Sequence, residues 1–214
     1  TMIKSALFDL DGVLADTETI YTRIWTAIGE AFPTGYADFA QRIKGTTLPN
    51  ILSTYFPTDE IRTEVKKMLD EAEETMEYPI YDGVIDFLKD LRRSHIRTAI
   101  VTSSSPLKMD RFFKANPGFA TYFDAILTDA DVKRSKPDPE GYLLAAARLA
   151  SEPRESIVFE DSYNGLRAGR AANAYVVALA TTNPADTLTE LSDTVINSFE
   201  DLTFEDLKQL LHIA

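Results

Sequence analysis

Short apolar runs, rich in β-branched and aromatic residues, recur along the chain at intervals that leave room for a helix between them. Most of these runs are continuous and do not alternate with polar residues, which is typical of strands covered on both faces. The pattern predicts strands at residues 3–8, 98–102, 125–128, 156–160, 175–180 and 194–197.

Helical periodicity fills the intervals between these strands. Residues 83–93 place Val84, Phe87, Leu88 and Leu91 on one stripe, and residues 139–149 do the same with Leu143, Ala146, Ala147 and Leu149. Further helices are predicted at 165–172 and 204–211, and a helical pattern follows Pro106. Strand and helix in repeated succession indicate an α/β fold with a doubly wound parallel sheet.

One stretch interrupts this succession. Residues 17–81 contain no strand pattern, only helical ones, at 20–32, 36–43 and 59–76. The last of these is rich in charge and is interpreted as an exposed helix. We therefore predict a catalytic core formed by residues 1–16 and 82–214, with an all-helical domain inserted at 17–81.

Charge and residue usage narrow the possible chemistry. The chain holds 22 Lys+Arg against 34 Asp+Glu, a net charge of −12, which disfavours nucleic acids and anionic membranes as partners. It has no cysteine and only two histidines, so thiol catalysis and Cys- or His-rich metal sites are excluded. Any metal site must use oxygen ligands. Neither a signal-peptide pattern nor an apolar run of ~20 residues is visible, and a cytoplasmic monomer is expected.

Two acidic pairs stand at the ends of predicted strands. Asp9 and Asp11 follow the first strand, and Glu160 and Asp161 close the fourth. Residues two apart in an extended chain point to the same side, and ligands of open α/β sheets bind beyond the carboxyl ends of the strands. Like charges ~4 Å apart repel by about 4 kcal/mol at an effective dielectric constant near 20, so the cluster requires a cation. Mg²⁺ is the leading candidate, although either pair taken alone is also compatible with an ordinary turn.

Two further segments offer what a phosphate group needs. Thr102, Ser103 and the serines after them supply hydroxyls and backbone N–H groups before a helix that begins at Pro106. Lys136, between serine and proline in a loop after the third strand, could add a fixed positive charge. Considered separately, the first segment also fits a plain helix cap and the second a solvated surface lysine.

Taken together and in this order, the four segments resemble the haloacid dehalogenase-like (HAD) superfamily, subfamily I, in its branch of β-phosphoglucomutases and small-molecule phosphatases. The resemblance implies a Rossmann-like core with a mobile helical cap. It implies that Asp9 is the nucleophile that forms an aspartyl-phosphate, and that Asp11 is the general acid and base. Thr102 and Ser103 would bind phosphoryl oxygens, and Lys136 would offset negative charge. Asp9, the backbone carbonyl of Asp11, Asp161 and Glu160 (directly or through water) would bind Mg²⁺.

The expected reaction is Mg²⁺-dependent hydrolysis of a small, sugar phosphate-like phosphomonoester. Dehalogenases and phosphonate hydrolases of the superfamily lack an acid at the position of Asp11. Substrate contacts are expected from cap residues that face the core, namely Glu18, Tyr21, Arg42, Lys44 and Gly45, although each could equally be solvated helix surface.

A β-phosphoglucomutase-type sugar phosphomutase is the alternative, since Lys44-Gly45 and Trp25 resemble those enzymes. In an ungapped alignment from Asp11, however, Tyr21 occupies the position of the mutase histidine, Leu48 that of an arginine, and Ser105 that of a lysine for a second phosphate. A more distant alternative is a non-enzymatic signalling module phosphorylated on aspartate. Such modules are shorter and carry no helical insertion.

Overall fold

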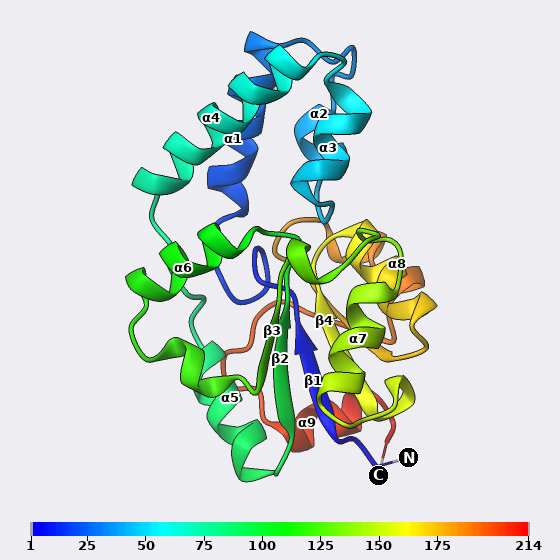
Figure 1. Ribbon diagram of the computed structural model, residues 1–214. Helices are drawn as coiled ribbons and strands as arrows, with labels where there is room; N and C mark the ends of the chain where they lie inside the picture. Colours follow the sequence, from blue (N-terminus) through cyan, green and yellow to red (C-terminus); the bar gives the residue numbers. More distant parts are fainter. Residues whose placement is uncertain (1, 214) are drawn as a thin grey trace.

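The computed structural model describes residues 2–213, which form a six-stranded parallel sheet in the order β3-β2-β1-β4-β5-β6 (Figure 1). The strands are β1 (Ser5–Phe8), β2 (Arg97–Val101), β3 (Ala125–Leu127), β4 (Ser156–Glu160), β5 (Tyr175–Leu179) and β6 (Thr194–Ile196). All pairings are parallel, and β1 lies between β2 and β4. Winding reverses at β1, which is the place where open α/β sheets bind ligands.

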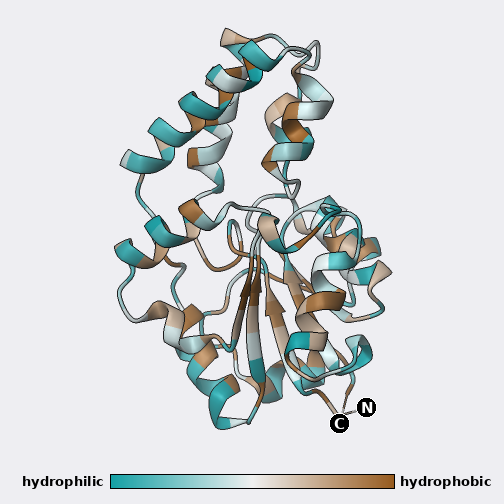
Figure 2. Ribbon diagram, viewed as in Figure 1, coloured by the Kyte–Doolittle hydropathy of each residue, from teal (hydrophilic) through white to brown (hydrophobic). Residues whose placement is uncertain are grey.

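Helices cover both faces of the sheet. On one face lie α5 (Val84–Arg93), α6 (Pro106–Ala115) and α9 (Phe204–Leu210), and on the other α7 (Glu140–Arg148) and α8 (Tyr163–Ala171). Phe8 of β1 stacks on Phe159 of β4 with ring centroids 4.5 Å apart, in the core beneath α5. The strands are accordingly mainly apolar, with polar residues chiefly at their ends (Figure 2).

The doubly wound parallel fold is confirmed, and each predicted strand is present with ends within two residues of those expected. One predicted helix face is correct in part, since Ala146 and Leu149 are buried as expected. Leu143 and Ala147 of α7 are exposed, and Tyr142 and Ala145 are buried in their place. The large Tyr142 ring sets the buried stripe because its hydroxyl reaches a buried carboxylate, Glu160.

The inserted segment, called the cap below, stands over the carboxyl ends of the strands (Figure 1). It contains α1 (Glu18–Ala31), α2 (Phe39–Arg42), α3 (Leu48–Tyr55) and α4 (Asp59–Thr75). These helices share an apolar cluster that includes Trp25, Phe39, Leu52 and Val65. Helix α2 is shorter than the pattern at 36–43 predicts. Helix α3, which the sequence pattern did not predict, begins at Leu48 with Pro49 in its first turn. Among residues 2–213, none of the helices has both the length and the hydrophobicity that a membrane span needs.

Candidate active site

Three buried carboxylates converge where β1 and β4 end. Phe8 pairs with Phe159, so Asp9, directly after β1, lies beside Glu160, the last residue of β4. Asp9, Glu160 and Asp161 are 7%, 0% and 1% exposed, and each offers an oxygen within 4.8 Å of the other two. The predicted convergence of the two acidic pairs is therefore present for these three residues. The carboxylate of Asp11 is not part of the group.

Lys136 supplies the positive charge within this cluster. Its ammonium donates to Glu160 Oε1 at 2.6 Å, to Asp9 Oδ1 at 3.1 Å and to the Val101 carbonyl at 3.0 Å. The side chain is 6% exposed, so the solvated alternative is wrong for this lysine. The Tyr142 hydroxyl also donates to Glu160 Oε1. The Asp161 N–H donates to Glu160 Oε2 at 3.2 Å, so Glu160 is fixed by three donors, and Asp9 is linked to it through one shared ammonium group.

One lysine does not balance three carboxylates. Burial, and then the charge of Glu160, raise the pKa of Asp9 to about 8. Burial, followed by the charges of Glu18, Asp9 and Glu160, raises the pKa of Asp161 well above its ordinary value. Burial disfavours the charged form of Lys136, but Asp9 and Glu160 outweigh it and raise the pKa of that ammonium. The surroundings therefore favour an additional cation.

The donor set fits a small divalent cation that prefers oxygen ligands. Asp161 Oδ1 is buried and has no hydrogen-bond partner among residues 2–213, which would be costly unless a ligand completes it. Asp161 Oδ2 accepts from Thr182. Two glycines leave space for these carboxylates. A Cβ on Gly12 (φ +81°) would lie 2.0 Å from Asp161 Oδ2, and one on Gly165 would lie 2.0 Å from the Glu160 carboxyl carbon.

The carboxylate of Asp11 lies beside a different lysine. Lys108, on the first turn of α6, forms an ion pair with Asp11 Oδ2, and Thr17 donates to Asp11 Oδ1. Ser104 Oγ is 3.4 Å from Asp11 Oδ2. Lys108 was missed in the sequence, where a lysine in a helix is typical of exposed surface. The signal that could have found it is its position two residues after Pro106, which starts α6 at the end of β2.

A cavity of about 120 Å³ opens beside Asp9 and Asp11, between the core and the cap. Thr102, 5% exposed, lines it together with Ser103, Ser104 and Ser105. Ser105 caps α6 by accepting from the Lys108 N–H at 3.2 Å, which confirms the helix start. Ser103 Oγ donates to the Gly45 carbonyl at 2.9 Å, so it joins the core to the cap.

The predicted cap residues separate into three groups. Tyr21 and Gly45 line the cavity. Lys44 forms an ion pair with Glu18 and donates to Thr22 at 3.1 Å, so these two charged residues satisfy each other. Arg42 does not face the core as expected, because it is exposed and pairs with Asp38 one helical turn earlier.

Comparison with known proteins places this geometry in a family. The model of haloacid dehalogenase-like hydrolases matches residues 3–173. Hexitol phosphatase A of Escherichia coli (strain K12) is 34% identical over 208 residues, covering 94% of this chain and 93% of that protein. Validoxylamine A 7'-phosphate phosphatase of Streptomyces hygroscopicus subsp. limoneus is 31% identical, covering 88% and 91%. A β-phosphoglucomutase structure from Clostridium difficile has a TM-score of 0.82 at 23% identity, covering 99% of this chain and 98% of that one, which shows a shared fold.

Proposed function

The chain belongs to the haloacid dehalogenase-like hydrolase family, and from that premise we propose that it is a Mg²⁺-dependent phosphatase acting on a small, sugar phosphate-like monoester. The observation that carries the proposal is the buried Asp9 carboxylate, held by Lys136 at one end of a cavity that Asp11 and Thr102 also line. The relatives named as phosphatases of hexitols, carbohydrates and fructose 1-phosphate support the substrate class.

Asp9 is proposed as the nucleophile. One of its oxygens forms a bond to phosphorus while the bond from phosphorus to the ester oxygen breaks, leaving an aspartyl-phosphate. Asp11 gives a proton to the departing oxygen. In the second half, Asp11 takes a proton from water as that water attacks phosphorus, and Asp9 leaves as a carboxylate. Phosphate and an alcohol are the products, and both residues return to their starting state.

The remaining groups manage the charge. Thr102 and backbone N–H groups at the start of α6 would bind phosphoryl oxygens, and Lys136 offsets the repulsion between the anionic nucleophile and the phosphate. Asp9, the Asp11 carbonyl and Asp161 would hold Mg²⁺, with Glu160 directly or through water. When bound, that ion would supply further positive charge to stabilise the transferring phosphoryl group.

The phosphomutase alternative is not favoured. Three relatives at 30–34% identity are named as phosphatases, and the mutase neighbour at 23% identity shares the fold alone. Tyr21, which occupies the position of the mutase histidine in the ungapped alignment, lines the cavity. Family membership also favours a hydrolase over a signalling module. The cytoplasmic location and the monomeric state of the protein stay predictions.

The test is a phosphate-release panel over sugar phosphates, nucleotides, pyrophosphate and small acid phosphates, with Mg²⁺ or with EDTA. Parent protein should release phosphate only with Mg²⁺, and Asp9→Asn should lose at least about a thousandfold in turnover, since an amide cannot form the aspartyl-phosphate. Equal release by Asp9→Asn would disprove the role of Asp9. Rapid Mg²⁺-dependent conversion of β-glucose 1-phosphate to the 6-phosphate would instead establish the mutase.

A further inference from the structure

The cavity extends past the phosphoryl site to the cap, where the two sides of its lining differ in polarity. An apolar side comes from the cap, with Trp25, Ile43, Leu48, Ile51 and Leu69. The polar side comprises Glu73, Tyr21, Lys108 and the serine hydroxyls that follow β2. An apolar surface with a few convergent polar groups is typical of a site for a small organic molecule. The part of the substrate that leaves as an alcohol would lie here.

The cations around this space are already paired. Among the described residues that line the cavity, Lys108 is the only lysine or arginine. It is ion-paired with Asp11, and its ammonium lies 4.1 Å from the centre of the Tyr21 ring. Nearby, Lys136 is held by Asp9 and Glu160, and Lys44 by Glu18. A second phosphate or a carboxylate on the leaving group would meet no unpaired positive charge.

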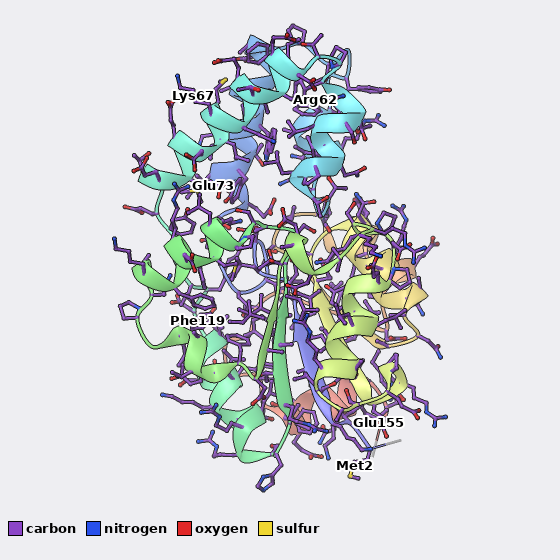
Figure 3. All side chains as sticks on the ribbon, viewed as in Figure 1. Met2, Arg62, Lys67, Glu73, Phe119 and Glu155 are labelled. Carbon is purple, nitrogen blue, oxygen red and sulfur yellow. The ribbon has the colours of Figure 1, made fainter. Side chains whose placement is uncertain are left out.

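Glu73 and Tyr21 present polar groups to the same cavity. Glu73 lies near the end of α4 that is closest to the core (Figure 3) and is 7% exposed. Within residues 2–213 it forms no ion pair: Lys108 pairs with Asp11, and Arg111 pairs with Asp70 at 2.9 Å. The Tyr21 hydroxyl is buried and has no hydrogen-bond partner among the described residues. Buried polar groups are normally satisfied, so the Tyr21 hydroxyl points to a ligand that brings a hydroxyl group, and the Glu73 carboxylate, which lines the same cavity, offers that ligand an acceptor.

We propose that Glu73 and Tyr21 form a hydroxyl-binding subsite for the leaving group, so that the enzyme selects monophosphates of neutral polyols or sugars over substrates with a second anionic group. Glu73 accepts a hydrogen bond from a substrate hydroxyl, and the Tyr21 hydroxyl exchanges one with a neighbouring hydroxyl. Glu73 is then the specificity-determining residue, because it also repels a second phosphate. This inference rests on the proposed phosphatase function and adds the substrate class.

The test compares fructose 1-phosphate with fructose 1,6-bisphosphate, which differ only in the second phosphate, and glucitol 6-phosphate as another neutral monophosphate. p-Nitrophenyl phosphate is the reference, because its leaving group has no sugar hydroxyls. We expect kcat/KM of the parent to favour the monophosphates over the bisphosphate. In Glu73→Gln the ratio of kcat/KM for fructose 1-phosphate to that for p-nitrophenyl phosphate should fall by about 10- to 100-fold, the loss expected for one hydrogen bond to a charged group.

Two further variants sharpen the comparison. Glu74→Gln changes the neighbouring, exposed carboxylate of α4 and should leave the ratio at its parent value. Glu73→Lys should shift preference toward the bisphosphate, since it places a cation where a second phosphate would lie. Thermal unfolding of each variant checks that it is folded.

The outcomes separate this inference from the proposed function. If the folded parent hydrolyses none of the four compounds, the phosphatase proposal fails first and the subsite fails with it. If p-nitrophenyl phosphate is hydrolysed but Glu73→Gln keeps the parent ratio, only the subsite is wrong. The inference is likewise overturned if the parent prefers the bisphosphate to both monophosphates.

Discussion

The buried ammonium of Lys136 should carry both stability and chemistry. It lies 2.6 Å from Glu160 Oε1 and 3.1 Å from Asp9 Oδ1, and its side chain is 6% exposed. At an effective dielectric constant near 20, the attraction to Glu160 is worth roughly 6 kcal/mol before the desolvation of the charges is subtracted, and the attraction to Asp9 adds to it where Asp9 is ionised. Removing one member of such a buried group leaves uncompensated charge, and the measured net cost of doing so is about 3–5 kcal/mol.

Lys136→Met tests this, because methionine has a similar shape and no charge. Guanidinium unfolding in EDTA at pH 7 should show a loss of about 3–5 kcal/mol in the free energy of unfolding. Phosphate release should fall by about a hundredfold to a thousandfold or more, since the nucleophile and the phosphate then repel each other without this offset. Added Mg²⁺ should restore part of the stability by binding between the carboxylates. Lys133→Met, at an exposed lysine in the same loop, should change neither quantity.

Two results would refute this reasoning in different ways. If Lys136→Met unfolded at the same guanidinium concentration as the parent, the three carboxylates would not depend on Lys136 for charge balance. If stability fell as expected while phosphate release stayed at the parent rate, Lys136 would be a structural residue and its assigned role in the reaction would be wrong.

Two further predictions concern the buried carboxylates proposed to bind Mg²⁺. Burial and Glu160 raise the pKa of Asp9 from 3.8 to about 8. Between these two pH values the folded metal-free protein keeps a proton on Asp9 that the unfolded chain has released, so the stability in EDTA should fall as the pH rises from about 4 to about 8. Calorimetry at pH 7 should accordingly show proton release on Mg²⁺ binding, and repeated toward pH 8 it should show a decreasing apparent Kd. A Kd independent of pH would contradict the raised pKa of Asp9. Gly12→Ala should abolish Mg²⁺ binding because the added Cβ would lie 2.0 Å from Asp161 Oδ2. The control is Gly118→Ala, where φ is also positive (+83°) but the added Cβ would meet no atom within 4 Å, so this variant should only lose about 1–2 kcal/mol of stability. Equal Mg²⁺ affinity in both variants would show that the contact with Asp161 does not matter.

The core and its carboxylates were predictable because parallel strands fix where their ends meet. An apolar run such as β4 (Ser156–Glu160) has few alternatives to a buried strand, and its bounds match the prediction. Once β1 and β4 are neighbours, Asp9 and Glu160 must lie together whatever the loops do. That rule uses only backbone geometry and the order of strands. It needs no knowledge of how side chains pack.

The roles of Lys108 and Glu73 could not be read in this way. Lys108 contacts Asp11, which is 97 residues away, and lies in a helix where a lysine is typical of exposed surface. Glu73 follows Val65 and Leu69 at a spacing of four residues, which places it on the buried face of α4 while its neighbour Glu74 is exposed, but the spacing does not show what a carboxylate does there. Both assignments depend on how the cap lies against the core, which neither periodicity nor motif spacing specifies.

The contacts that hold the cap near the phosphoryl site use its backbone more than its side chains. Ser103 donates to the Gly45 carbonyl at 2.9 Å, and Asn164 donates to the Lys44 carbonyl at 3.0 Å. Gly45 has φ +80°, and a Cβ there would lie 2.5 Å from Ser162 Oγ, so close approach of this loop to the core requires glycine. The loop that follows β2 and the first turn of α8 therefore contact the cap through two carbonyls. Because the Glu73 side chain takes no part in these two contacts, the proposed selectivity for the leaving group can change at that position without breaking them.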